Sequence, residues 1–263
     1  MRRHVVTVAN ALAVFAALLL LWQLILWIFR VPQFMLPSPW AVAKALVARF
    51  PSLLQSFAIT AEEAVGGILL SIVVGVGVAL IFAQSRWVRR MLYPWTLLLQ
   101  TVPIVAIAPL ILMWVGAGTF SVSLIAFIIS LAPIIANTTQ GLISVDENLV
   151  HLFLMHNATS AQLLFKLRLP HAVPSLFVGI RIASGIAVIG AITGELYAGS
   201  SSVGRGGLGY AISYAYSQLQ TDYLFALVLA ATVLGFGFLF LVMFLEWYFL
   251  HHWHESARPP DVE

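Results

Sequence analysis

The sequence has no cysteine and very little charge. Only 9% of its 263 residues are Asp, Glu, Lys or Arg, whereas a soluble globular domain carries about 25%. The absence of cysteine excludes disulfides, thiol catalysis and cysteine-ligated metals, and it says little about the compartment. Because 61% of the residues are hydrophobic, the chain is predicted to be an integral membrane protein.

Two kinds of chemical motif are also missing from the sequence. No nucleotide-binding loop of the GxxxxGK[ST] kind occurs, and no His, Asp or Glu cluster has metal-ligand spacing. The net charge of +3 comes from few charges, so it gives no reason to expect a nucleic-acid partner. We therefore predict no catalytic residue, no metal site and no cofactor in this chain. If the protein performs work, the energy must come from a gradient or from a partner protein.

The apolar blocks are much longer than membrane β-strands, which favours an all-α bundle over a barrel. The basic start of the chain leads into an apolar stretch without a small-residue cleavage site, so we interpret this stretch as a retained first span. Residues 1–263 are predicted to form a single transmembrane domain, with a loop at about 142–174 and a polar tail at 250–263. Shorter amphipathic pieces are expected at 41–50 and 210–220. The six predicted transmembrane helices are about Ala11–Phe29, Phe57–Phe82, Leu92–Val115, Val122–Thr139, Leu176–Tyr197 and Tyr223–Phe249.

Lysine and arginine predict the orientation, because cytoplasmic loops are enriched in them. With the N-terminus inside, eight of these residues fall on the inner side and four on the outer side. Arg181 lies just within the fifth predicted span and can extend to the inner face. Both termini and the 142–174 loop are therefore expected in the cytoplasm. The inner residues are Arg2, Arg3, Arg86, Arg89, Arg90, Lys166, Arg168 and Arg258, and the outer ones are Arg30, Lys44, Arg49 and Arg205.

The stretch from Asp146 to Pro174, DENLVHLFLMHNATSAQLLFKLRLPHAVP, is the longest polar-bearing interval between two apolar blocks. Its leucines recur at helical spacing, which predicts a pair of amphipathic helices. Asn157 interrupts the pattern, and Pro170 and Pro174 are predicted to end it. Such a segment either docks a partner or rests on the bilayer surface.

Polar residues within the predicted spans are candidates for a translocation path, because hydrocarbon makes them costly. Glu62 and Glu63 are adjacent, so their side chains point about 100° apart on a helix and only one of them can face the interior. Each carboxylate either lines the path or makes a structural hydrogen bond, and for the amides hydrogen bonding between helices is favoured. Prolines in the third span suit a helix that lines a cavity. The candidate path residues are Glu62, Glu63, Gln100, Thr101, Pro103, Asn137 and Glu195.

Four stretches resemble the permease subunit of binding-protein-dependent ABC importers of the type I fold. The stretch LRLPHAVPSLFVGIRIA is similar to the end of that family's cytoplasmic coupling loop, and SVDENL matches its acidic entry. LYPWTLLLQTVPIVAIAPLILMWVGAG and TGELYAGSSSVGRGGLGYAI are similar to the nitrate, sulfonate and thiamine-precursor branch. The resemblance covers roughly residues 36–250. The coupling residues that it implies are Asp146, Glu147, His151, Asn157, Ala158, Thr159, Ser160, Leu169 and Pro170.

The head of this loop departs from the family pattern E-A-A-x-x-x-G. His151, Leu152 and Phe153 stand in place of the acid and the two alanines, and Asn157 stands in place of the glycine. Asparagine tolerates positive φ, so the turn between the two helices is expected to survive. The bulky residues predict a larger and more apolar docking face, and His151 removes an ion pair that the acid would form with the ATPase.

The resemblance implies a multi-pass protein of the inner membrane with several partners. These are two copies of an ABC ATPase that holds ATP and Mg²⁺, a second permease copy in a homodimer, and an extracytoplasmic solute-binding protein. Because two carboxylates line an anion path poorly, a pyrimidine-type vitamin precursor or related heterocycle is favoured as the solute. Import of nitrate, bicarbonate or a sulfonate is the alternative. A gradient-driven secondary transporter and a purely structural subunit are further alternatives.

Overall fold

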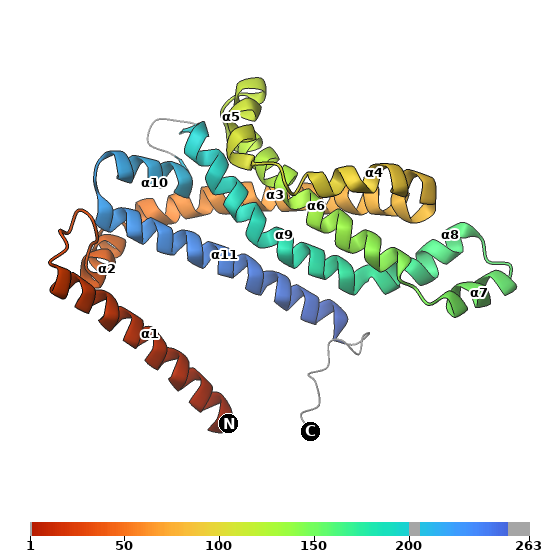
Figure 1. Ribbon diagram of the computed structural model, residues 1–263, viewed down its shortest axis with the longest axis horizontal. Helices are drawn as coiled ribbons and strands as arrows, with labels where there is room; N and C mark the ends of the chain where they lie inside the picture. Colours follow the sequence, from red (N-terminus) through yellow and green to blue (C-terminus); the bar gives the residue numbers. More distant parts are fainter. Residues whose placement is uncertain (1, 200–205, 252–263) are drawn as a thin grey trace.

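The structure is a computed structural model that describes residues 2–199 and 206–251 (Figure 1). All the regular elements in these ranges are helices, which confirms the predicted all-α class. One of them, η1, is a short π-helix. In chain order they are α1 (Arg2–Phe29), α2 (Pro39–Ala48), α3 (Phe50–Gln84), α4 (Arg86–Leu98), α5 (Ile104–Val115), α6 (Thr119–Ile143), α7 (Glu147–Met155), α8 (Ser160–Leu163), η1 (Leu164–Arg168), α9 (Leu169–Ala198), α10 (Leu208–Ser217) and α11 (Thr221–Leu250).

The centre of the bundle is formed by α6, which packs along both α3 and α9, while α11 lies against α9. Two glycines allow α6 to approach its neighbours closely. A Cβ on Gly67 of α3 would lie 2.6 Å from the Ala126 Cβ, and one on Gly190 of α9 would lie 2.9 Å from the Ala126 Cα. Small residues at such contacts let helix backbones approach, which is how membrane helices gain packing energy without a hydrophobic driving force.

Within the described residues, four helices are long and apolar enough to cross a membrane: Phe50–Gln84, Thr119–Ile143, Ser160–Ala198 and Thr221–Leu250. They contain the predicted second, fourth, fifth and sixth spans. The predicted first span is also helical, as part of α1, which lies apart from the central helices (Figure 1). It approaches α11 at Trp22, whose ring centroid is 5.7 Å from that of Phe225.

The prediction of one continuous third span at Leu92–Val115 is wrong. Two helices cover this stretch: α4 ends at Leu98, and α5 begins at Ile104, with Pro103 as its N-cap. Proline has no N–H and disfavours helical geometry in the residue before it, so the helix cannot pass residues 102 and 103. At about 1.5 Å per residue, α5 is too short to cross a bilayer. Helix α4 lies along α3, and α5 turns away from it (Figure 1).

The prediction that Pro170 and Pro174 end the 146–174 segment is also wrong. Pro170 lies in the first turn of α9, Pro174 lies inside it, and α8, η1 and α9 together form one helix over Ser160–Ala198. The ring of a proline clashes with the carbonyl four residues earlier, which for Pro170 belongs to Lys166. The π-helical turn of η1 spans this position, and its wider ring gives the proline room.

The bundle is elongated, with different short helices at its two ends (Figure 1). Helices α2 and α10 lie at one end, and α7 and α8 lie at the other. Two basic residues used in the orientation prediction, Arg205 and Arg258, lie outside the described residues, as does the predicted tail from residue 252 onwards.

Candidate functional site

The segment between α6 and α9 begins with a capped helix. The Asp146 side chain accepts a hydrogen bond of 2.8 Å from the Asn148 backbone N–H, and Glu147 lies in the first turn of α7. A carboxylate at this position satisfies a free N–H group and complements the helix dipole. Two of the predicted coupling residues therefore fix where α7 starts.

Asn157 forms the turn between α7 and α8, as predicted. Its φ of 55° is left-handed. The Asn157 N–H donates to the Leu154 carbonyl at 3.0 Å, and the Ala158 N–H donates to the Phe153 carbonyl at 3.0 Å. This pair of bonds is a Schellman motif, which normally has glycine at the left-handed position. The asparagine thus preserves a turn for which the family pattern has glycine.

Helix α8 begins with a reciprocal cap that the sequence analysis missed. The Thr159 hydroxyl accepts from the Gln162 N–H at 3.2 Å, and the Gln162 side chain accepts from the Thr159 N–H at 2.8 Å. The T-x-x-Q spacing is a readable signal of this capping box. Ala158 and Ser160 flank Thr159, so this group of predicted residues sets the geometry of the second helix.

The base of the segment is anchored to the bundle. Leu164 is buried with Ala79 and Ala83 at the end of α3 and with Leu142 of α6, and Leu169 packs against the same cluster. Arg168 donates to the Ala83 carbonyl at 3.1 Å. The base is therefore continuous with the core.

The remainder of the segment presents apolar side chains to its surroundings. Met155 is 81% exposed and Leu152 is 49% exposed, and His151 is exposed as well. A cavity of about 300 Å³ between the two helices is lined by Leu152, Phe153, His156, Ala158, Gln162 and Lys166. Helices α7 and α8 extend beyond the ends of α6 and α9 (Figure 1). An apolar patch in this position is typical of a docking surface.

The two adjacent glutamates of α3 diverge, as their 100° separation predicts. Glu62 is exposed, whereas Glu63 is only 4% exposed. Glu63 interacts with Glu195 of α9, which is 2% exposed, and with Thr119 at the start of α6. The two carboxylates inside the subunit are therefore Glu63 and Glu195, a pairing between distant helices that the sequence analysis did not anticipate.

Glu195 ties three helices together through its carboxylate. It accepts hydrogen bonds from the Thr60 hydroxyl at 2.7 Å and from the Gly209 N–H at 2.6 Å. Thr60 in turn accepts from the Leu208 N–H at 2.8 Å. Residues of α3 and α9 thus cap the first turn of α10, whose N–H groups have no partner within their own helix.

A glycine makes room for this carboxylate. A Cβ on Gly207 would overlap the Glu195 carboxylate and would lie 2.6 Å from the Thr60 hydroxyl. The sequence analysis noted the Glu-to-GLG resemblance but missed Thr60, and no sequence spacing connects residue 60 with residue 195. We refer to Thr60, Glu63, Glu195, Leu208 and Gly209 as the buried polar cluster.

The other candidate path residues do not join this cluster. Gln100 and Thr101 are exposed in the break between α4 and α5, next to Pro103. Asn137 donates to the Pro133 carbonyl of its own helix at 2.8 Å. The favoured hydrogen bond between helices is therefore absent from its described contacts.

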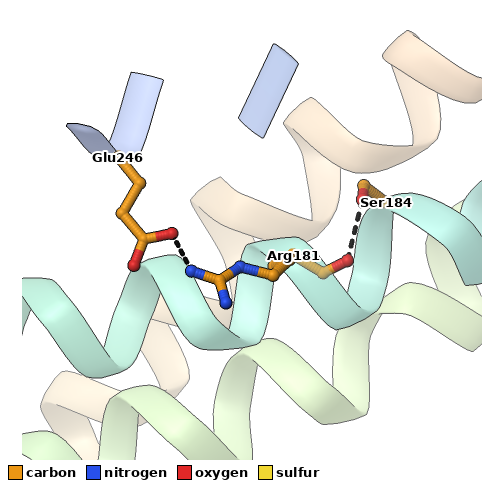
Figure 2. A network of polar contacts seen from close by, with 3 residues as sticks. All are labelled: Arg181, Ser184 and Glu246. Atoms are coloured by element: carbon orange, nitrogen blue, oxygen red, sulfur yellow. Dashed lines mark hydrogen bonds and ion pairs between the residues drawn. The ribbon is translucent and has the colours of Figure 1, made fainter. Parts of the chain in front are cut away.

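Arg181 of α9 forms an ion pair with Glu246 of α11, as Figure 2 shows. The backbone carbonyl of Arg181 accepts a hydrogen bond of 2.8 Å from Ser184. The sequence analysis expected that Arg181 can extend to the inner face and did not consider Glu246. The ion pair links two of the long helices.

The helical bundle, with four helices long and apolar enough to cross a membrane among its described residues, has the architecture of an integral membrane protein. The chain belongs to the family described as the binding-protein-dependent transport system inner membrane component, which matches residues 67–251. It is therefore the permease subunit of an ABC importer, and it is not itself an enzyme.

Several curated relatives align with most of the chain. A probable ABC transporter permease protein of Haemophilus influenzae is 34% identical over 218 residues, which cover 83% of this chain and 87% of the relative. The riboflavin transport system permease protein RibX of Chloroflexus aurantiacus is 34% identical, with coverages of 79% and 76%. The formylaminopyrimidine transport permease protein ThiX of Halalkalibacterium halodurans is 31% identical, with coverages of 84% and 86%.

The solved structures show the same fold. A chain of the inward-facing MetNI methionine ABC transporter superposes with a TM-score of 0.56 at 18% sequence identity. The superposition covers 85% of this chain and 99% of that chain. It supports the type I permease fold and carries no information about the solute.

Proposed function

We propose that the chain couples ATP hydrolysis in a partner to import, through the segment from Asp146 to Pro170. The observation that carries this proposal is the exposed apolar face of α7, with Leu149, Leu152 and Met155, on a base anchored in the core. An external binding protein delivers a small solute, which passes through the permease toward the cytoplasm.

The proposed assembly has two ABC ATPase subunits and two permease copies as a homodimer. ATP and Mg²⁺ bind to the ATPase, and α7 and α8 dock in a groove on its surface. Leu152 and Met155 supply apolar contact area. His151 faces outward at the place where the family pattern has an acid, so this interface depends less on an ion pair.

This docking also implies how the protein is oriented in the membrane. If α7 and α8 meet a cytoplasmic ATPase, then α2 and α10 face the outside of the inner membrane and both termini are cytoplasmic. The excess of Lys and Arg on the inner side agrees with this orientation. Because family membership identifies an ABC importer permease, neither a gradient-driven carrier nor a purely structural subunit has support.

For the solute we propose a small planar heterocycle of the pyrimidine-precursor or flavin type. RibX and ThiX, named for riboflavin and formylaminopyrimidine, are 34% and 31% identical to this chain. The SsuC protein of Bacillus subtilis, named for aliphatic sulfonates, is 30% identical, so import of a sulfonate is the second candidate. Glu62 is exposed, and this carboxylate disfavours an anion path. Gln100, Thr101 and Pro103, in the break between α4 and α5, are proposed to line the path, together with Asn137.

Two substitutions at Asn157 test the coupling role. Proline is incompatible with a φ of 55°, and it removes the N–H that donates to Leu154. Asn157→Pro should therefore reduce co-purification of the ATPase and solute uptake. Glycine adopts positive φ freely, so Asn157→Gly is the matched control and should retain both.

The readouts are the ratio of ATPase to permease after affinity purification and uptake into cells. Both variants must reach the membrane at wild-type levels, measured by immunoblot. Wild-type co-purification together with unchanged uptake in Asn157→Pro would refute the coupling role of this segment.

A further inference from the structure

A cavity of about 430 Å³ lies between the start of α3, α10 and the start of α11, at the end of the bundle away from α7 and α8. We infer that this cavity binds the incoming solute and takes planar ring compounds that carry hydrogen-bond acceptors. This inference rests on the proposed importer function, and it identifies where and through which chemistry the permease receives the solute from the binding protein.

Aromatic rings dominate one side of the cavity. Tyr210 and Tyr214 of α10 are stacked with their centroids 6.3 Å apart, and Tyr223 of α11 also lines the space. The Arg49 guanidinium lies 4.7 Å from the centroid of the Tyr223 ring. Flat π-systems and a guanidinium plane favour another flat ring, because stacking and cation–π contacts depend on face-to-face area.

The polar lining consists largely of groups that can donate hydrogen bonds. Arg49 has five N–H donors, one of which is directed at Gln220. Ser52 and Gln55 line the same space. The described lining contains no Asp or Glu. A ring nitrogen or carbonyl oxygen can accept these bonds, whereas a cationic ligand would face Arg49 with no described carboxylate to balance its charge.

The buried polar cluster holds the wall of the cavity in place. Ser56, which lines the cavity, donates to the Gly206 carbonyl at 2.9 Å. Thr60 and Glu195 accept the N–H groups of Leu208 and Gly209 in the first turn of α10. Because α10 carries two of the tyrosines, these bonds hold in place the start of the helix that presents the rings to the cavity. Such preorganisation reduces the entropy cost of binding.

The test uses the full permease–ATPase complex in lipid nanodiscs, with riboflavin as a fluorescent planar probe. Stacking on tyrosine quenches flavin emission, so a titration gives an apparent Kd. Tyr214→Ala should raise this Kd roughly tenfold, which corresponds to about 1.4 kcal/mol of lost stacking. Tyr216 of the same helix is 73% exposed and does not line the cavity. Tyr216→Ala is therefore the matched control and should leave the Kd unchanged.

Competition identifies the chemical class of ligand. Formylaminopyrimidine should displace riboflavin, whereas taurine, which has no ring, should not. Absence of saturable quenching, equal weakening by Tyr214→Ala and Tyr216→Ala, or equal displacement by taurine would each overturn the inference. If the same preparation retains its ATPase and transports solute, such a failure applies to this cavity alone and leaves the proposed coupling intact.

Discussion

Replacing Thr60 with valine should weaken the attachment of α10 to the bundle by an amount that follows from two hydrogen bonds. The Thr60 hydroxyl donates to Glu195 at 2.7 Å and accepts from the Leu208 N–H at 2.8 Å. Valine keeps the branched shape and removes both bonds, leaving a buried carboxylate oxygen and a buried N–H without this partner. At about 1–3 kcal/mol for each of the two unsatisfied groups, the free energy of unfolding should fall by roughly 2–6 kcal/mol.

Thr193→Val is the matched control. Thr193 is also buried, at 8% exposure, but its hydroxyl donates only to the Ile189 carbonyl one turn earlier in the same helix. Deleting such a bond should cost little, because that carbonyl retains its helical partner. Tryptophan fluorescence during thermal unfolding in detergent measures both variants, and hydrogen exchange of residues 206–212 localises the effect. Equal thermal midpoints for the two variants, with unchanged exchange at α10, would refute the role assigned to Thr60.

Two further substitutions test packing and charge in the bundle. Gly67→Ala should destabilise the protein by about 1–3 kcal/mol through overpacking against Ala126, whereas Gly77→Ala, which meets nothing within 4 Å, should be neutral or stabilising in a thermal unfolding scan. Equal midpoints would contradict the close approach of α3 and α6. Arg181→Gln should lower the free energy of unfolding by about 1 kcal/mol. Adding Glu246→Gln should restore part of this loss, because the unpaired carboxylate is then removed. An additive loss in the double mutant would argue against a stabilising ion pair.

The long apolar helices were predictable from composition and periodicity. The second and sixth predicted spans lie inside α3 and α11 because a long and largely apolar run leaves the backbone no alternative to a helix in a membrane. The turn at Asn157 was predictable as well, because asparagine is one of the few residues other than glycine that tolerate positive φ. These are local properties, set by a residue and its immediate neighbours.

The prolines were harder to interpret, because their effect depends on how neighbouring turns adjust. Pro103 ends a helix, whereas Pro170 begins one next to a π-helical turn. Pro103 follows LLLQTV and Pro170 follows LFKLRL, so a leucine-rich stretch with polar residues precedes both, and the sequence around them does not separate the two outcomes. The wider turn at η1 depends on contacts that are distant in the sequence, because its first residue, Leu164, packs against the ends of α3 and α6.

The buried polar cluster was the least predictable feature. Thr60 and Glu195 are 135 residues apart and meet only because α3 and α9 both pack beside α6. Glu63 was singled out with Glu62, its sequence neighbour, whereas in the structure its partner is Glu195. Pairings of this kind depend on helix rotation and register, which no single segment encodes.

The continuous helix over Ser160–Ala198 has a mechanical consequence. With 39 residues at about 1.5 Å of rise each, it is roughly 60 Å long. Its first turn belongs to the proposed docking segment, and Glu195 near its other end holds α10. If the helix tilts as a rigid rod by roughly 5° about its middle, each end moves by roughly 3 Å. In the proposed assembly this helix therefore connects the docking segment at one end to the tyrosine-lined cavity wall at the other, and its hydrogen-bond pattern changes at η1.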